Sequence, residues 1–302
     1  MSNSPLGGRP TTTQTYVVVV VAAVLVSALL APVAYDRASQ PDGAVAVVTI
    51  DGFISSTSVD NVAEDLREVR ENESVKAVVL KVDSPGGSAA ASERLYMEVK
   101  RTANVMPVVA SVQSTGASGA YYAMLPAETI HVTPASIVGS VGVRGSAPGP
   151  TPSGEIRSGP DKASMTADQA RRQIETLQRA FVGTVMAERG DRIELSRTEV
   201  AHAKVYTGAR AVDNGMADRI GTLSDATSEA ADAAGLDDYE TYRKEPALGG
   251  GFILLSADSG DNGETTVVVE EGVGFDAVDS RTYLMVYGDV QYENEVIGNV
   301  SS

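Results

Sequence analysis

The stretch AVVLKVDSPGG, residues 77–87, predicts the fold class. Its first part, Ala77–Val82, is apolar and rich in β-branched residues, which is typical of a buried strand. Asp83–Gly87 then interrupts this pattern with proline and glycine, and a helical pattern follows as far as Lys100. A strand, a turn and a helix in this order form one unit of an α/β fold.

The same alternation recurs on both sides of this unit. Val45–Ile50 is a second predicted strand, and apolar residues recur at helical spacing from Val59 to Val69. Two further strands are predicted at Pro107–Val112 and Thr129–Val132. Strands that alternate with helices favour a largely parallel sheet that is covered on its faces.

Later helices are predicted from capping boxes. Thr166 is followed by a glutamine three residues on, and Ser196 by a glutamate, so helices are expected near 167–189 and 197–203. Residues 143–162 are rich in Gly, Pro and Ser and are expected to form a loop.

The C-terminal extension, residues 245–302, is of uncertain structure. It contains two β-like runs, Thr265–Val269 and Thr282–Val286. The pattern is compatible with extra strands or with a partly disordered tail.

The apolar run Tyr16–Ala34 predicts one transmembrane helix, because as a helix it matches a hydrocarbon core of about 30 Å. A cleaved signal peptide is the alternative, but Pro32 departs from the small-residue pattern before a cleavage site. The predicted organisation is a cytoplasmic tail (1–15), a membrane helix (16–34), a linker (35–43) and a folded α/β domain (44–244). We expect a single-pass protein of the cell membrane, with this domain outside the cytoplasm.

The composition excludes several classes of function. The formal charge is −16, with 40 acidic against 24 basic residues, so a nucleic-acid partner is not expected. This balance resembles proteins of salt-loving archaea, in which molar salt screens repulsion between surface charges; an ordinary acidic protein is the alternative. The chain has no cysteine, which excludes disulfides, thiol catalysis and thiolate metal sites.

Two glycine-rich segments are candidates for a catalytic site. Ser118 lies between small residues after an apolar strand, and the N-terminus of the next helix would stabilise a developing negative charge beside it. Ser118 is equally compatible with a simple helix cap. Ser84–Gly87 follows another strand, where paired glycines expose amides suited to an oxyanion hole. The alternative for Ser84–Gly87 is a plain turn.

A nucleophilic serine needs a base, and the chain offers few. The two histidines, His131 and His202, lack the context of a Ser-His-Asp arrangement and are predicted to be structural. The six lysines are Lys76, Lys81, Lys100, Lys162, Lys204 and Lys244. Lys162 is the one that lies within the Gly/Pro-rich region, although on pattern alone the favoured interpretation is a surface loop lysine.

Five ordered motifs resemble the signal peptide peptidase A family. They are Ser84-Pro85-Gly86-Gly87, Ala117–Tyr122, Thr133-Pro134 with Gly139–Val143, Ser158-Gly159-x-x-Lys162, and Tyr206-Thr207-Gly208 through Gly215–Asp218. The resemblance covers residues 44–236. It implies a Clp/crotonase-like spiral α/β fold and a membrane-anchored serine endopeptidase with a Ser–Lys dyad.

The resemblance also implies roles for single residues. Ser118 takes the position of the nucleophile and Lys162 that of the general base. Gly87 and Gly119 correspond to oxyanion-hole donors, and Ser140 to a serine that orients the lysine. No cofactor or metal is implied. The implied partners are apolar peptides such as remnant signal peptides, membrane lipid around residues 16–34, and further copies of the chain in a ring.

Two other classes remain as alternatives. A crotonase-type enzyme acting on acyl-CoA would share the fold and the glycine-rich oxyanion hole but would need neither Ser118 nor Lys162. A catalytically silent membrane scaffold would keep the fold and the anchor without either residue.

Overall fold

The computed structural model describes residues 41–145, 158, 165–244 and 284–286, together with residues 20, 21 and 24. The chain divides into two units, Met1–Asp42 and Gly43–Ser302. Within the described ranges, no helix has both the length and the apolar composition that a membrane crossing requires. The predicted membrane helix, 16–34, lies outside the described residues except for those three positions, and so does the β-like run 265–269.

One sheet organises the unit that begins at Gly43. Its strands in the described chain are β1 (Gly43–Ile54), β2 (Val75–Ser88), β3 (Val108–Ala117), β4 (Thr129–Val132), β5 (Ile137–Gly139), β6 (Val205–Thr207), β7 (Arg219–Ile220), β8 (Tyr239–Lys244) and β9 (Leu284–Val286). The helices are α2 (Ser56–Glu71), α3 (Ala89–Ala103), α4 (Gly119–Met124), α5 (Ala167–Arg189), α6 (Arg197–Ala201), α7 (Gly208–Asp213) and α8 (Leu223–Ala233), with a 3-10 turn at Gly190–Arg192.

The sheet is largely parallel. Its central order is β6-β5-β3-β2-β1-β8, and β4, β7 and β9 join beside this path. The antiparallel pairs among the described strands are β5 with β6 and β2 with β9. Strand β3 is forked: Val109–Val112 pairs with β4, whereas Thr115–Ala117 pairs with β5. The predicted α/β class with a largely parallel sheet is therefore confirmed.

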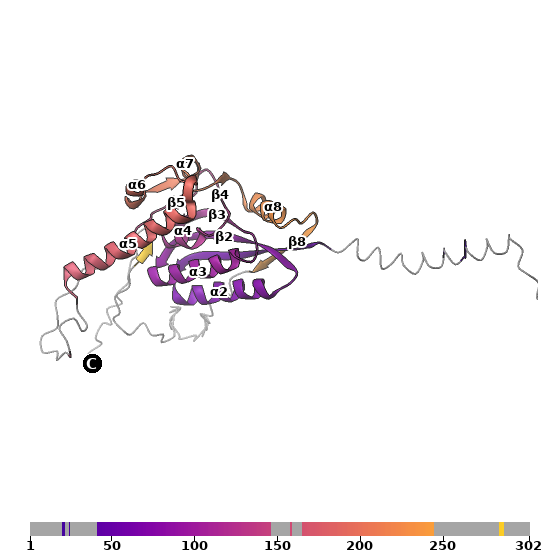
Figure 1. The fold of residues 1–302 in the computed structure, drawn as a ribbon, viewed down its shortest axis with the longest axis horizontal. Helices are drawn as coiled ribbons and strands as arrows, with labels where there is room; N and C mark the ends of the chain where they lie inside the picture. The colour runs from indigo at the N-terminus through magenta and orange to yellow at the C-terminus, as the bar shows by residue number, and fades with distance from the viewer. Residues whose placement is uncertain are drawn as a thin grey trace, which may run out of the picture. The chain divides into compact units, whose positions relative to one another are not determined.

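The core lies on both faces of the sheet because successive side chains of a strand point to opposite sides. On β1, Val48 and Ile50 belong to a large cluster with α2, α3, α4 and α5, whereas Val45 and Val47 pack with α8. Figure 1 shows α2 and α3 along one side of the strands and α8 on the other. The first half of β3 likewise contributes to both clusters, with Val108 and Val112 in the first and Val109 in the second.

The predicted capping boxes are present. The Thr166 hydroxyl accepts a hydrogen bond from the Gln169 amide at 3.2 Å, and α5 runs over the predicted 167–189. The second capping box begins at Ser196, but α6 ends at Ala201, before Ala203 adopts a positive φ of 54°. A residue in that left-handed region cannot continue a right-handed helix.

Strand β2 is longer than predicted. The sequence places its end at Val82, but the Pro-Gly-Gly segment stays extended to Ser88. The reason is pairing with a distant segment: Phe53 and Ile54 of β1 lie opposite Gly86 and Gly87. The glycine pair therefore belongs to the sheet, where it lies between β1 and β9, and is not a loop between strand and helix.

Candidate active site

Ser118 lies in a strained turn between β3 and α4, which we call the Ser118 elbow (Ala117–Gly119). Its backbone has φ 54° and ψ −118°, a conformation that a non-glycine residue adopts only when its surroundings impose it. The Ser118 amide donates to the Gly139 carbonyl at 2.7 Å, and its own carbonyl accepts from the Tyr122 amide at 2.9 Å. Strand β5 and helix α4 therefore hold the elbow from both ends. A strained serine between a strand and a helix is typical of hydrolase nucleophiles.

The Ser118 side chain has no hydrogen-bond partner among the described residues. The residue is 1% exposed, and its Oγ is buried. A buried hydroxyl without a partner is unfavourable by about 1–3 kcal/mol, so such a group in a native structure calls for a functional explanation. A hydroxyl kept available for a base or a substrate is one.

Glycines allow the elbow to pack closely. A Cβ on Gly119 would lie 2.2 Å from the Ser92 hydroxyl of α3, and a Cβ on Gly116 would lie 2.9 Å from the side chain of Val112. Both distances are shorter than real contacts permit. Any larger side chain at these two positions would push α4 away from α3 or from β3.

The Pro-Gly-Gly segment lies against the elbow. Gly86 has φ +96°, and a Cβ built on it would lie 2.6 Å from the Gly119 amide nitrogen and 3.0 Å from the Ala117 carbonyl oxygen. Gly87, the next residue, pairs with Ile54. The structure thus brings the two glycines of β2 beside Ser118 and Gly119, where their backbone groups can approach one bound carbonyl.

Ser84 fixes the glycine segment, a role that the sequence reasoning did not assign. Its hydroxyl is fully buried, donates to the Gly52 carbonyl at 2.6 Å and accepts from the Gly86 amide at 3.1 Å. A serine two residues before a glycine in a turn-forming stretch is the local signal for such a bond.

We expect Ser84→Ala to destabilise the fold by about 1–3 kcal/mol, because the Gly52 carbonyl and the Gly86 amide would both lose a buried partner. Urea denaturation of the full chain in detergent measures this cost. Ser114→Ala on β3 is the control, because Ser114 is exposed and should change stability by no more than about 0.5 kcal/mol. Equal costs for the two variants would contradict the assigned role.

Ser140 follows the strand end that contacts the elbow. Gly139 pairs with Ala117, and Ser140 is half-buried with a positive φ of 56° and donates its amide to the Lys204 carbonyl at 2.8 Å. Its backbone is therefore fixed next to the Ser118 segment. Lys162, the predicted base, lies outside the described residues.

Among the described residues, no hydrogen bond joins either histidine to the Ser118 elbow. His131 is buried in β4, where its Nε2 lies 2.7 Å from the Glu229 carboxylate. It pairs with Ser111, seven residues before Ser118, which corresponds to roughly 20 Å of strand. His202 is exposed at the end of α6.

Two tyrosines of α4 anchor the elbow to the rest of the domain. Tyr121 is fully buried and donates to the Met216 carbonyl at 2.8 Å; burial raises the pKa of its hydroxyl, which stays neutral. The Tyr122 ring packs edge-on against Phe181 of α5, with ring centroids 4.8 Å apart. The Met216 carbonyl therefore helps to hold α4, the helix that follows Ser118, in place.

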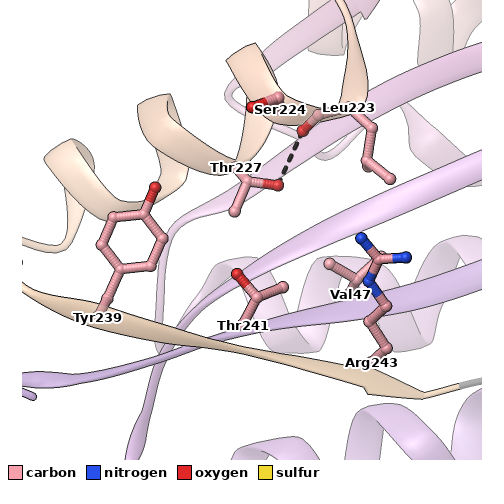
Figure 2. Close-up of a pocket in the computed structure, with 7 residues that line it drawn as sticks. All are labelled: Val47, Leu223, Ser224, Thr227, Tyr239, Thr241 and Arg243. Atoms are coloured by element: carbon pink, nitrogen blue, oxygen red, sulfur yellow. Dashed lines mark hydrogen bonds between the residues drawn. The ribbon is translucent and has the colours of Figure 1, made fainter.

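A separate hollow of about 240 Å³ lies between α8 and β8, and Figure 2 shows the residues that line it. Its lining residues are Val47, Leu223, Ser224, Thr227, Tyr239, Thr241 and Arg243, and Thr227 donates to the Leu223 carbonyl at 2.8 Å. None of these residues belongs to the elbow or to the glycine segment. Within the described part of the chain, no group of three or more His, Asp or Glu side chains is arranged to hold a metal ion.

Comparison with known proteins agrees with this geometry. The model of the family described as Peptidase family S49 matches residues 100–149 and 161–237. Protease 4 of Salmonella typhi is 31% identical over 68% of this chain, which spans only 37% of that protein's length. The relative slr0021 of Synechocystis sp. is also 31% identical, over 64% of this chain and 75% of its own length.

Among solved structures, a mutant of the 1510-N membrane-bound stomatin-specific protease has the same fold. Its TM-score is 0.50 at 17% sequence identity, and the match covers 69% of this chain and all of that one. The family match, together with a relative covered over three quarters of its length, shows that this chain belongs to peptidase family S49.

Proposed function

We propose that this chain is a membrane-anchored serine endopeptidase with Ser118 as nucleophile and Lys162 as general base. The observation that carries the proposal is the Ser118 elbow, in which a strained backbone presents a buried hydroxyl without a partner in the described chain. The close approach of Gly86 to the Gly119 amide supports an oxyanion hole at the same place.

In the proposed reaction, Lys162 takes the proton of Ser118 while Oγ attacks the carbonyl carbon of a bound peptide. The amides of Gly87 and Gly119 stabilise the negative oxygen that forms, and Gly119 also begins a helix whose first amides lack intrahelical partners. Lys162 then protonates the leaving amine, and water hydrolyses the acyl-enzyme. Ser140 would orient the lysine amine.

This chemistry requires a neutral lysine, whose pKa is ordinarily near about 10.4. Burial lowers a lysine pKa, whereas a neighbouring carboxylate raises it. Asp83 is the carboxylate nearest in sequence to the glycine segment, and its Oδ1 accepts a hydrogen bond from the Thr115 amide at 3.0 Å. For the base to be uncharged, this carboxylate must lie out of contact with the lysine amine.

We propose further that the fold is of the Clp/crotonase type and that residues 16–34 anchor the chain in the membrane. The proposed substrates are apolar, extended peptides such as remnant signal peptides. The name of the 1510-N enzyme describes a membrane-bound protease, in keeping with an anchor. A further mutant of that enzyme, at 17% identity, was solved with a substrate peptide. We also propose assembly with further copies of the chain and, from the charge of −16, activity in high salt.

Reaction with a fluorophosphonate separates this proposal from an acyl-CoA enzyme or a silent scaffold, because the reagent marks an activated serine. We expect the full chain to be labelled in high salt and Ser118→Ala to remain unlabelled, as measured by mass spectrometry of the labelled peptide. Ser114 lies on β3, the strand that leads to Ser118, and is exposed, so Ser114→Ala should be labelled like the wild type. Labelling that persists in Ser118→Ala would contradict the assignment of the nucleophile.

A further inference from the structure

The two proposed oxyanion donors come from separate segments of the chain. Gly87 lies near the end of β2, whereas Gly119 begins α4 directly after Ser118. A donor stabilises the negative oxygen of the reaction only when its amide is aimed at the place where that oxygen forms. A misplacement of about 1 Å can slow an enzyme by on the order of 10²-fold. The proposed reaction therefore needs a fixed spacing between the end of β2 and the start of α4.

Ser92 of α3 lies against both of these segments. Its hydroxyl donates to the carbonyl of Ser88, the residue that follows Gly87, at 2.8 Å. The same oxygen lies 2.2 Å from the position that a Cβ on Gly119 would take, and the Ser92 Cβ lies 3.0 Å from that position. One side chain is thus bonded to the neighbour of the first proposed donor and packs directly against the second.

The stability of α3 does not explain a serine at this position. Ser92 is 0% exposed, and among the described residues its hydroxyl bonds only to the carbonyl four residues earlier. A bond of this kind slightly destabilises and often bends a helix, and alanine has a higher helix propensity than serine. Alanine is also the residue at the neighbouring buried positions Ala89 and Ala91. A buried hydroxyl that contributes so little to its own helix calls for another role.

We propose that Ser92 is a positioning residue of the oxyanion hole, which fixes the spacing of the Gly87 and Gly119 amides. This inference rests on the proposed protease function. The hydrogen bond to Ser88 holds the end of β2 in place. The hydroxyl oxygen fills the space beside Gly119 and so sets how closely α4 approaches α3. Ser92 need not touch the reacting atoms, because it acts through the two glycines.

Steady-state hydrolysis of an apolar peptide by the full chain, in detergent and high salt, tests this proposal with Ser92→Ala. We expect kcat to fall by about 10- to 100-fold while KM stays within about two-fold, because oxyanion donors act on the transition state and not on substrate binding. A peptide aldehyde provides a second readout, because its adduct with Ser118 places an oxygen in the same hole. Its affinity for Ser92→Ala should fall by the same factor as kcat/KM.

Thr227→Val is the matched control. The Thr227 hydroxyl is also buried, and it donates to the Leu223 carbonyl four residues earlier at 2.8 Å, but its helix, α8, packs on the opposite face of the sheet. Each variant removes one buried hydroxyl that bonds within its own helix, so urea denaturation should show similar small changes in stability for both. Thr227→Val should keep kcat within about two-fold of the wild type.

The outcomes separate this inference from the protease function on which it rests. A Ser92→Ala chain that keeps the kcat of the wild type would overturn the positioning role and leave the protease function standing. A Ser92→Ala chain that is much less stable than Thr227→Val would also overturn it, because Ser92 would then serve the fold. A wild type that neither hydrolyses the peptide nor reacts with fluorophosphonate at Ser118 would overturn both proposals.

Discussion

Replacing Ser118 by alanine is expected to lower hydrolysis of an apolar peptide by on the order of 10⁴- to 10⁶-fold, and Lys162→Ala is expected to do the same. The first change removes the nucleophile, and the second leaves a hydroxyl whose proton no group accepts. The two losses should not add, because residues that act as one catalytic unit fail together. Peptide hydrolysis by the full chain in high salt measures both, with the double variant as the test of non-additivity.

Ser114→Ala and Lys76→Ala are the matched controls. Ser114 is exposed on β3, and the Lys76 amine donates to the Glu73 carbonyl at 2.7 Å on the surface. Both variants should keep activity within about two-fold, and circular dichroism should show that all variants are folded. If Ser118→Ala alone removes activity, another group is the base; if neither change does, the protease proposal is wrong.

The parts of the fold that were predictable have local causes. Strand β4 and helix α5 have the predicted bounds because a short β-branched run and a capping box are fixed by neighbouring residues. Helix α8 has the same kind of start, in which the Thr222 hydroxyl accepts from the Asp225 amide, and the sequence reasoning overlooked it. The capping-box pattern at Thr222 therefore predicts the start of α8 from the sequence.

Other features depend on contacts between distant segments. Strand β8 is polar in its own sequence and forms because Tyr239–Lys244 pairs with β1. The extension of β2 to Ser88 likewise depends on β1 and β9, which no local pattern contains. Thr282–Val286 was a predicted β-like run, but its place beside Gly87 follows from tertiary pairing alone.

The candidate site also has features that the local sequence predicts and features that depend on contacts between distant segments. Small residues around Ser118 indicated an uncrowded hydroxyl, and the glycines of β2 indicated exposed amides, so both segments were predictable. The hydrogen bonds of Ser84 and the contact between Ser92 and Gly119 required the folded chain. Gly215–Asp218 was recognised as a motif without a role, and the structure shows it to be a support for α4 and α5.

Asp218→Asn is expected to destabilise the fold by about 3–5 kcal/mol at pH 7, because it leaves a buried cation without its partner. The Arg189 side chain is 0% exposed, and its Nη1 and Nη2 donate to the two carboxylate oxygens of Asp218 at 2.9 and 2.8 Å. The same carboxylate accepts from the Ile130 amide at 2.8 Å, which ties α5 to β4. Urea denaturation at fixed salt measures the cost.

The cost should depend on pH with a defined sign. Burial by itself would raise the pKa of Asp218, but the hydrogen bonds and charge of Arg189 hold this pKa below its usual value. A carboxylate whose pKa is lowered on folding contributes stability above its unfolded pKa of about 3.9 and loses that contribution as the pH falls through the folded pKa. The difference in unfolding free energy between wild type and Asp218→Asn should therefore be constant from pH 7 to 5 and shrink below about pH 4.

Asp213→Asn is the matched control for this ion pair. Asp213 lies 3.5 Å from Arg210, and both side chains are largely exposed, so its loss should cost no more than about 1 kcal/mol. A cost for Asp218→Asn that is as small as this, or one that stays unchanged at pH 3, would contradict the structural role of the buried pair. The expected outcome instead explains why an acidic motif far along the chain from Ser118 bears on the elbow: Asp218 orders the loop whose Met216 carbonyl accepts the Tyr121 hydroxyl of α4.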